Sequence, residues 1–152
     1  MAFLVYNKIK TYIMQGQLDF REAGDDLRIM LVMTNTTCDT EDDIQFLDGF
    51  TTEDEYTDGA SYPPSFANRN TLDTQAVNEQ LSDDRVEFDA VDEVISSIAA
   101  SSSGRLNQGI VIYKQITNDA ASLPIVFITA GFAGNGGNVT LQFNSEGILQ
   151  LA

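Results

Sequence analysis

Residues 27–34 read LRIMLVMT, the clearest structural signal in the chain. Leu27, Ile29, Leu31 and Met33 alternate with Arg28, Met30, Val32 and Thr34. A period of two residues is typical of a β-strand. Because both sets of side chains are largely apolar, we expect a strand that is buried on both faces.

Five later segments are also predicted as strands. They are VEFDA at 86–90, IVIYK at 110–114, PIVFIT at 124–129, VTLQF at 139–143 and ILQL at 148–151. Pro124 is predicted to occupy the first position of its strand, where the missing N–H does no harm. Residues 92–97 are predicted as either a strand or a turn.

Residues 131–137, GFAGNGG, form a glycine-rich segment between two of these strands. The segment lacks the Gly-Lys-Ser/Thr ending of a phosphate-binding loop, and a strand pattern follows it where that loop would need a helix. Its Asn-Gly and Gly-Gly pairs supply the positive-φ positions of a hairpin. We therefore predict a hairpin turn here.

Short connections and the absence of a helical pattern among the last four strands indicate antiparallel pairing. The predicted fold class is mainly β: an antiparallel β-sandwich or a jelly-roll-like barrel with a short N-terminal α-helix. The 152 residues suit a single domain, 1–152. Within it we expect a helix over about 2–15, an acidic loop-rich middle over about 35–85, and a strand-rich C-terminal part over about 86–152.

The first segment has helical periodicity. One face of the expected helix carries Phe3, Tyr6, Ile9, Ile13 and Met14. Gly16 follows at a position where helices commonly end. Because so short a helix is marginal alone in water, its apolar face must pack on another surface. That surface is either the sheet of the same chain or a partner chain.

The chain is strongly acidic, with 23 Asp and Glu residues against eight Lys and Arg and a net charge of −15. This balance argues against direct binding to nucleic acid, whose phosphates are neutralised by Lys and Arg. It also argues against an anionic membrane surface. Seventeen of the acidic residues lie between residues 39 and 93. That segment would attract a basic surface or a divalent cation.

Two acidic clusters are the places where a cation would bind. The first contains Asp39, Glu41, Asp42 and Asp43, and the second contains Glu53, Asp54, Glu55 and Asp58. Ca²⁺ prefers such clustered oxygen ligands, but neither cluster has the spacing of an EF-hand loop. The alternatives are a solvated acidic face and an interface patch. No cofactor is predicted, with Ca²⁺ kept as the alternative.

The chain contains no histidine and one cysteine, Cys38. Ser-His and Cys-His nucleophile pairs are therefore absent, and no disulfide can form within the chain. Pairs of carboxylates like those of glycosidases are too numerous to indicate a cleft. No apolar run approaches the roughly 18 residues that span a bilayer, and no secretory signal is evident. We expect a protein that is not an enzyme and is used without export.

Several segments resemble a group of small tailed-phage virion proteins. Residues 6–10, YNKIK, and 16–20, GQLDF, are similar to their Tyr-Asn-x-Phe-Lys helix and Gly-x-Ile-Asp-Leu segment, and residues 28–32, RIMLV, to the strand that follows. The resemblance resumes in RVEFDA at 85–90, IVIYK at 110–114, PIVFI at 124–128, GGNVTL at 136–141 and NSEGIL at 144–149. The order of these segments carries the resemblance. Residues 39–70 depart from the group's pattern in their acidity and in Tyr62-Pro63-Pro64.

The resemblance implies a virion structural protein, in particular a capsid decoration (cement) protein on the outer capsid surface, made in the host cytoplasm. Its partners would be the major capsid protein, copies of itself as a homodimer or homotrimer, or both. One alternative is a tail-tube, neck or fibre-related virion component. An alternative of another class is a glycan-binding β-sandwich module, suggested by Tyr62, Phe66 and the acidic residues near them.

A decoration protein needs a surface that complements its neighbour, which large aromatic side chains and charged groups supply. The residues predicted to form this interface are Phe3, Tyr6, Tyr56, Tyr62, Phe66, Asp42, Asp43 and Asp54. The competing interpretation places the aromatic residues in the protein's own core.

Overall fold

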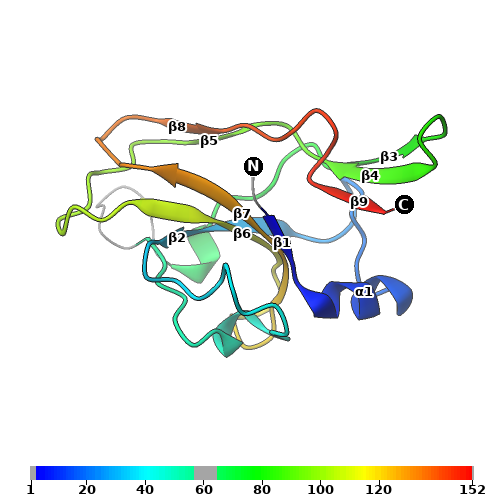
Figure 1. Ribbon diagram of the computed structural model, residues 1–152, viewed down its shortest axis with the longest axis horizontal. Coiled ribbons are helices and arrows are strands. Elements are labelled where there is room, and N and C mark those ends of the chain that lie inside the picture. Colours follow the sequence, from blue (N-terminus) through cyan, green and yellow to red (C-terminus); the bar gives the residue numbers. More distant parts are fainter. Residues whose placement is uncertain (1–2, 57–64, 152) are drawn as a thin grey trace.

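The computed structural model describes residues 3–56 and 65–151, in which one α-helix and two short 3-10 helices accompany nine strands (Figure 1). In chain order the elements are β1 (Phe3–Val5), α1 (Asn7–Met14), β2 (Leu27–Met33), η1 (Leu47–Gly49), η2 (Phe66–Asn68), β3 (Ala76–Gln80), β4 (Arg85–Asp89), β5 (Glu93–Ile95), β6 (Asn107–Lys114), β7 (Leu123–Phe132), β8 (Val139–Leu141) and β9 (Leu149–Leu151). Among the described residues, no helix has the length and apolar character needed to cross a membrane.

A four-stranded antiparallel sheet, in the order β1-β7-β6-β2, forms the centre of the molecule. β6 pairs with β2 on one side and with β7 on the other, so that Ile112 lies opposite both Ile29 and Val126. Every residue of β2 except Arg28 is buried. The sequence prediction of a strand buried on both faces is confirmed.

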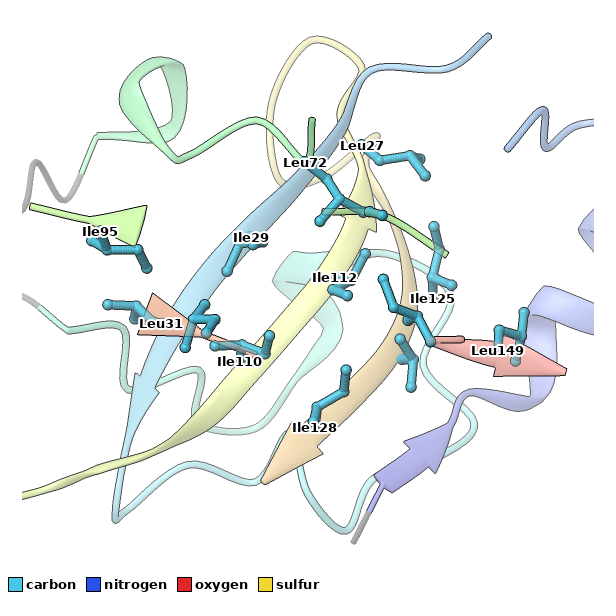
Figure 2. Packing of buried hydrophobic residues seen from close by; sticks show 14 of the residues in the cluster. Leu27, Ile29, Leu31, Leu72, Ile95, Ile110, Ile112, Ile125, Ile128 and Leu149 are labelled. Carbon is cyan, nitrogen blue, oxygen red and sulfur yellow. The ribbon is translucent and has the colours of Figure 1, made fainter. Parts of the chain in front are cut away.

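One face of the central sheet packs against two smaller antiparallel sheets, β3-β4-β9 and β5-β8, which lie along one side of it in Figure 1. Figure 2 shows this core, in which Ile29, Ile110 and Ile128 of the central sheet cluster with Ile95 and Leu149 of the smaller sheets. Burying each such side chain contributes roughly 1.5–3 kcal/mol. The predicted class, mainly β with antiparallel sheets and one short helix, is confirmed, with layers that face each other as in a sandwich.

The opposite face of the central sheet is covered by the connection between β2 and β3. Cys38, Leu47 and Phe50 from this connection form a second core cluster with residues of the central strands such as Val111 and Phe127. Burial raises the pKa of the Cys38 thiol to about 12, so this cysteine stays protonated at neutral pH. With both faces covered, the central strands must be apolar throughout, which is the pattern that residues 27–34 carry.

The β2 edge of the central sheet is closed by the same connection. The amide of Met33 donates to the carbonyl of Asp54 at 2.8 Å, and the amide of Leu72 donates to the carbonyl of Leu27 at 2.8 Å. Isolated bridges also join Val32 to Glu55 and Arg28 to Thr71. This edge of the sheet is therefore hydrogen-bonded within the chain.

The predicted strands at 86–90, 110–114, 124–129, 139–143 and 148–151 correspond to β4, β6, β7, β8 and β9. Residues 92–97 contain a strand, β5. Pro124 is the second residue of β7 and follows Leu123, so its predicted first position was wrong by one. β3 was not predicted, because its residues AVNEQ are mostly exposed and do not alternate; it forms by pairing with β4 along its whole length.

The helix predicted over 2–15 begins later than expected. Residues Phe3–Val5 form the strand β1, which pairs with β7, and the helix covers Asn7–Met14. Ile9 and Tyr12 of the helix are buried, whereas Met14 is 87% exposed. The apolar face predicted from 3.6-residue spacing is therefore wrong at both ends, since Phe3 lies in a strand and Met14 faces solvent. Ile9 packs in the protein's own core, which favours the first of the two surfaces expected for the helix.

The glycine-rich segment 131–137 does not form a hairpin, and that prediction was wrong. β7 pairs with β6 and β1, whereas β8 pairs with β5 in the opposite layer, so the segment crosses between layers. The crossing is fixed by backbone hydrogen bonds of Gly136 and Gly137 to Ile98. Gly136 has a φ of +86°, and a Cβ at Gly134 would overlap the carbonyl of Ala99. The glycines allow the chain to cross between the layers, because they tolerate a positive φ and a close approach of the backbone.

Candidate docking surface

Among the predicted interface aromatics that the structure describes, Phe3 is the most exposed, at 63%. It lies in β1, the edge strand of the central sheet. Its neighbour Val5 is half-buried and packs against the core. Phe3 is thus an apolar side chain held on a rigid element and accessible to a partner.

Tyr6 and Tyr56, also predicted for the interface, belong to the core. Both side chains are fully buried. The hydroxyl of Tyr6 donates to the carbonyl of Cys38 at 2.8 Å, and that of Tyr56 donates to the carbonyl of Ala99 at 2.6 Å. These bonds satisfy the polar ends of rings whose apolar parts fill the two clusters. The competing interpretation, that the aromatics are core residues, holds for this pair.

Phe66 and Tyr62 complete the predicted aromatic set. Phe66 is half-buried, and its ring lies 6.4 Å from the ring of Tyr113 and 5.5 Å from the guanidinium of Arg69. Phe66 therefore packs mainly on its own chain. Tyr62 lies outside the described residues.

The three predicted interface acids have intramolecular roles. The carboxylate of Asp43 accepts a hydrogen bond from the Asn7 side chain at 2.8 Å, and the backbone carbonyl of Asp42 accepts one from the Asn7 amide at 2.8 Å. Asp54 forms a salt bridge with Arg105 at 2.7 Å. Of the three, Asp43 is the exposed one. Asp42 and Asp43 hold the start of α1 against the connection that follows β2.

A buried arginine organises the second acidic cluster. Arg69, only 3% exposed, contacts the carboxylates of Glu55 at 2.8 Å and Asp119 at 2.5 Å. Burial lowers the pKa of Arg69, but its hydrogen bonds to Glu55 and Asp119 raise it by more, so the guanidinium stays charged. Glu53 nearby has its pKa raised to about 6 by burial and by the charge of Asp119, against the opposing effect of Arg69. The cluster has the contacts of a structural ion-pair network.

Two arginines form salt bridges with carboxylates that were predicted as cation ligands. Asp54 pairs with Arg105 and Glu55 pairs with Arg69. Across residues 3–56 and 65–151, no group of three or more His, Cys, Asp or Glu side chains is arranged to hold a metal ion.

Three hollows share a lining residue, Phe143, and one of them lies where the central sheet ends at β1. The hollow of about 430 Å³ is lined by Phe3, Val5, Ile128 and the segment from Phe143 to Gln150. A second, of about 260 Å³, lies between the end of β7 and β8, and a third, of about 570 Å³, adjoins the end of β4. Because Phe143 lines all three, they are neighbours, and we call them together the open groove.

The open groove is bordered by the edges of two sheets. β1 is the end strand of the central sheet and β9 is the end strand of β3-β4-β9. The hollow of about 430 Å³ contains residues of both, with Phe3 and Val5 on one border and Leu149 and Gln150 on the other. On this side the sandwich is open, in contrast to the β2 edge, which the chain itself closes.

The charged residues that line the three hollows are all acidic. They are Asp89, Asp92 and Glu146, and no described basic side chain lines any of them. Asp92 also fixes Phe143, because its carboxylate accepts a hydrogen bond from the Phe143 amide at 3.0 Å. The open groove therefore has an apolar floor and an acidic rim.

Sequence reasoning identified Phe3 but missed the rest of the groove. Phe143 was expected inside a strand, on the same face as Val139 and Leu141. Strand β8 ends at Leu141, but Phe143 packs against the same core cluster as Val139 and lines all three hollows. The local sequence does not signal this position, because it depends on contacts between distant segments such as the bond from the Phe143 amide to Asp92.

Comparison of the chain with protein-family models, with curated proteins and with solved structures finds no match.

Proposed function

We propose that this chain is a structural protein of a tailed-phage particle, a capsid decoration protein that docks on the head shell through the open groove. The observation that carries the proposal is the asymmetry of the central sheet. Its β2 edge is closed by four backbone hydrogen bonds from the chain itself, whereas its β1 edge ends at an apolar groove beside an exposed phenylalanine.

An exposed apolar surface next to a strand edge is a feature that soluble proteins normally cover. Its retention here, on a chain with neither histidine nor a described metal cluster, favours binding to another protein as the function. A decoration protein requires this property, because it stabilises the shell by binding the assembled form. The resemblance of several segments, in the same order, to small virion proteins supports the choice of partner.

Sedimentation with particles tests the proposal. Heads of the phage that encodes the chain, prepared without this protein, are mixed with the purified chain and pelleted. We expect saturable binding in hundreds of copies per head. Copies numbering only tens and located on the tail would instead identify a tail or neck component, and absence of the chain from particles would contradict a virion role.

Two variants test the surface used for docking. Phe3→Glu places a charge in the open groove and is expected to abolish binding to the heads. Ile116→Glu is the control, since Ile116 is exposed to a similar extent, 46%, and lines a different hollow with Tyr12 and Phe46. Equal loss of binding in both variants would contradict docking through the groove.

A further inference from the structure

We propose that the free edge of β1 accepts an extended segment of the partner protein as an additional strand of the central sheet, and that this segment alternates apolar with basic side chains. This inference deepens the proposed function and depends on it only for the identity of the partner.

The backbone of β1 has hydrogen-bonding groups that face outward. The Tyr6 amide donates to the carbonyl of Ile125 at 3.2 Å, which makes this a hydrogen-bonded position of the pairing with β7. In an antiparallel pair of strands, residues bonded to the neighbouring strand alternate with residues whose N–H and C=O groups point away from it. Phe3 and Val5 are therefore the positions whose N–H and C=O groups face the open side.

Asn7 is the next residue along the chain whose backbone N–H points away from β7, and this N–H already has a partner. The amide of Asn7 donates to the carbonyl of Asp42 at 2.8 Å, so the chain itself covers the edge from Asn7 onward. Phe3 and Val5 are left as a short acceptor site for an added strand. Peptides bind other domains in this way, with backbone bonds supplying affinity and side-chain pockets supplying specificity.

The groove defines which side chains the added strand must carry. Alternate residues of a strand point to the same face. One set would point to the face that Phe3, Val5 and Ile128 share, and would enter the hollow of about 430 Å³ that these residues line. That set must be apolar.

Charge defines the rest of the segment. The other set of side chains would point to the opposite face of the central sheet, toward which Leu4 packs and which the connection after β2 covers. There the chain places Asp42 and the exposed Asp43 beside the edge, bonded to Asn7. The partner segment should therefore carry lysine or arginine at the positions that alternate with its apolar side chains, where they meet these acids. A second copy of this chain fits poorly, because each copy carries a net charge of −15 and its β1 sequence, Phe-Leu-Val, has no basic residue.

The test uses an acetylated and amidated peptide of six residues alternating valine and lysine, with the valine–glutamate peptide as its control. We expect the lysine peptide to bind and to slow hydrogen exchange at the Phe3 and Val5 amides, and the glutamate peptide not to bind. A lysine peptide that does not bind, or that binds without protecting these two amides, would overturn the inference. So would protection that appears without peptide and depends on protein concentration, which would identify a second copy as the occupant.

A matched pair of variants separates backbone pairing from burial of the ring. Phe3→Ala and Phe3→Pro both remove the aromatic side chain, but only proline removes the outward N–H. Proline is tolerated on edge strands, and thermal melting would establish that both variants fold. Phe3→Pro should bind the peptide roughly three- to tenfold more weakly than Phe3→Ala, the effect of one hydrogen bond. Equal affinities would contradict strand addition, while binding of the chain to heads would still support the proposed function.

Discussion

Asp119 accepts two hydrogen bonds from the guanidinium of Arg69, at 2.5 and 3.2 Å. This pair joins the loop before β7 to the connection that closes the β2 edge, because Arg69 also binds Glu55, the residue bridged to Val32. The closed side of the molecule thus depends on one buried cation shared by two acidic segments.

Replacing Arg69 with methionine should strongly destabilise the fold. The change leaves the carboxylates of Glu55 and Asp119 without their common partner in a mostly buried site, and such losses cost about 3–5 kcal/mol. The free energy of unfolding, measured in urea, reports the effect. Arg21→Met is the control, since Arg21 pairs with Asp19 at the surface, and it should leave stability unchanged. Similar effects of the two substitutions would contradict a structural role for the buried cluster.

Glu53→Gln should stabilise the protein at pH 7 but not at pH 4.5. Burial, together with the charges of Asp119, Glu55 and Asp48 and against the opposing charge of Arg69, raises the pKa of Glu53 from its ordinary 4.5 to about 6. Its contribution to stability is therefore present below about pH 4.5 and is lost as pH rises through 6. The difference in melting temperature between variant and wild type should grow across this window.

Glu79→Gln is the control for the loss of one negative charge, since Glu79 is exposed on β3. If the difference in melting temperature between Glu53→Gln and wild type does not change with pH, the carboxyl group of Glu53 does not titrate in this window.

Gly109→Ala should destabilise the central sheet. A Cβ at Gly109 in β6 would overlap the carbonyl of Ile128 and the ring of Phe127. Because these groups belong to a buried neighbouring strand, overpacking should cost about 1–3 kcal/mol. Gly131→Ala provides the comparison, since its nearest neighbour, the carbonyl of Asn107, lies 3.7 Å from the added carbon. Chemical denaturation should show a loss for the first variant and none for the second.

Ile9→Ala should cost about 2–5 kcal/mol, the range for truncation of a buried isoleucine. Met14→Ala, at the other end of the same helix, should change stability by no more than about 0.5 kcal/mol, because its side chain is exposed. Thermal and urea unfolding of both variants would check the result. A stable Ile9→Ala variant would mean that the helix is not anchored in the core.

The strands of the two layers could largely be predicted from sequence, because a period of two in apolar residues directly reflects which faces are buried. β2 and β6 are the clearest cases, apolar on both sides and covered on both sides. β3 escaped prediction because its residues mostly face solvent, and β1 because three residues are too few to show a period. In both cases pairing with another strand overrides a weak local preference.

The docking surface was less predictable, because exposure depends on contacts between distant segments. Tyr6 and Phe3 look equivalent in sequence. Tyr6, however, bonds to Cys38 in the second core cluster, whereas Phe3 lines the open groove. The acidic residues likewise gave no indication of which ones would be neutralised. Asp54 meets Arg105 across 51 positions of sequence.

The order of strands in the central sheet also constrains when this protein can fold during synthesis. β1 has its pairing partner at residues 126–128 of β7, which are synthesised much later. The nascent chain therefore holds an apolar strand without a neighbour until β7 has been made. Pairing at such long sequence separation is slow, and a ribosome that stalled before β7 would display an aggregation-prone intermediate.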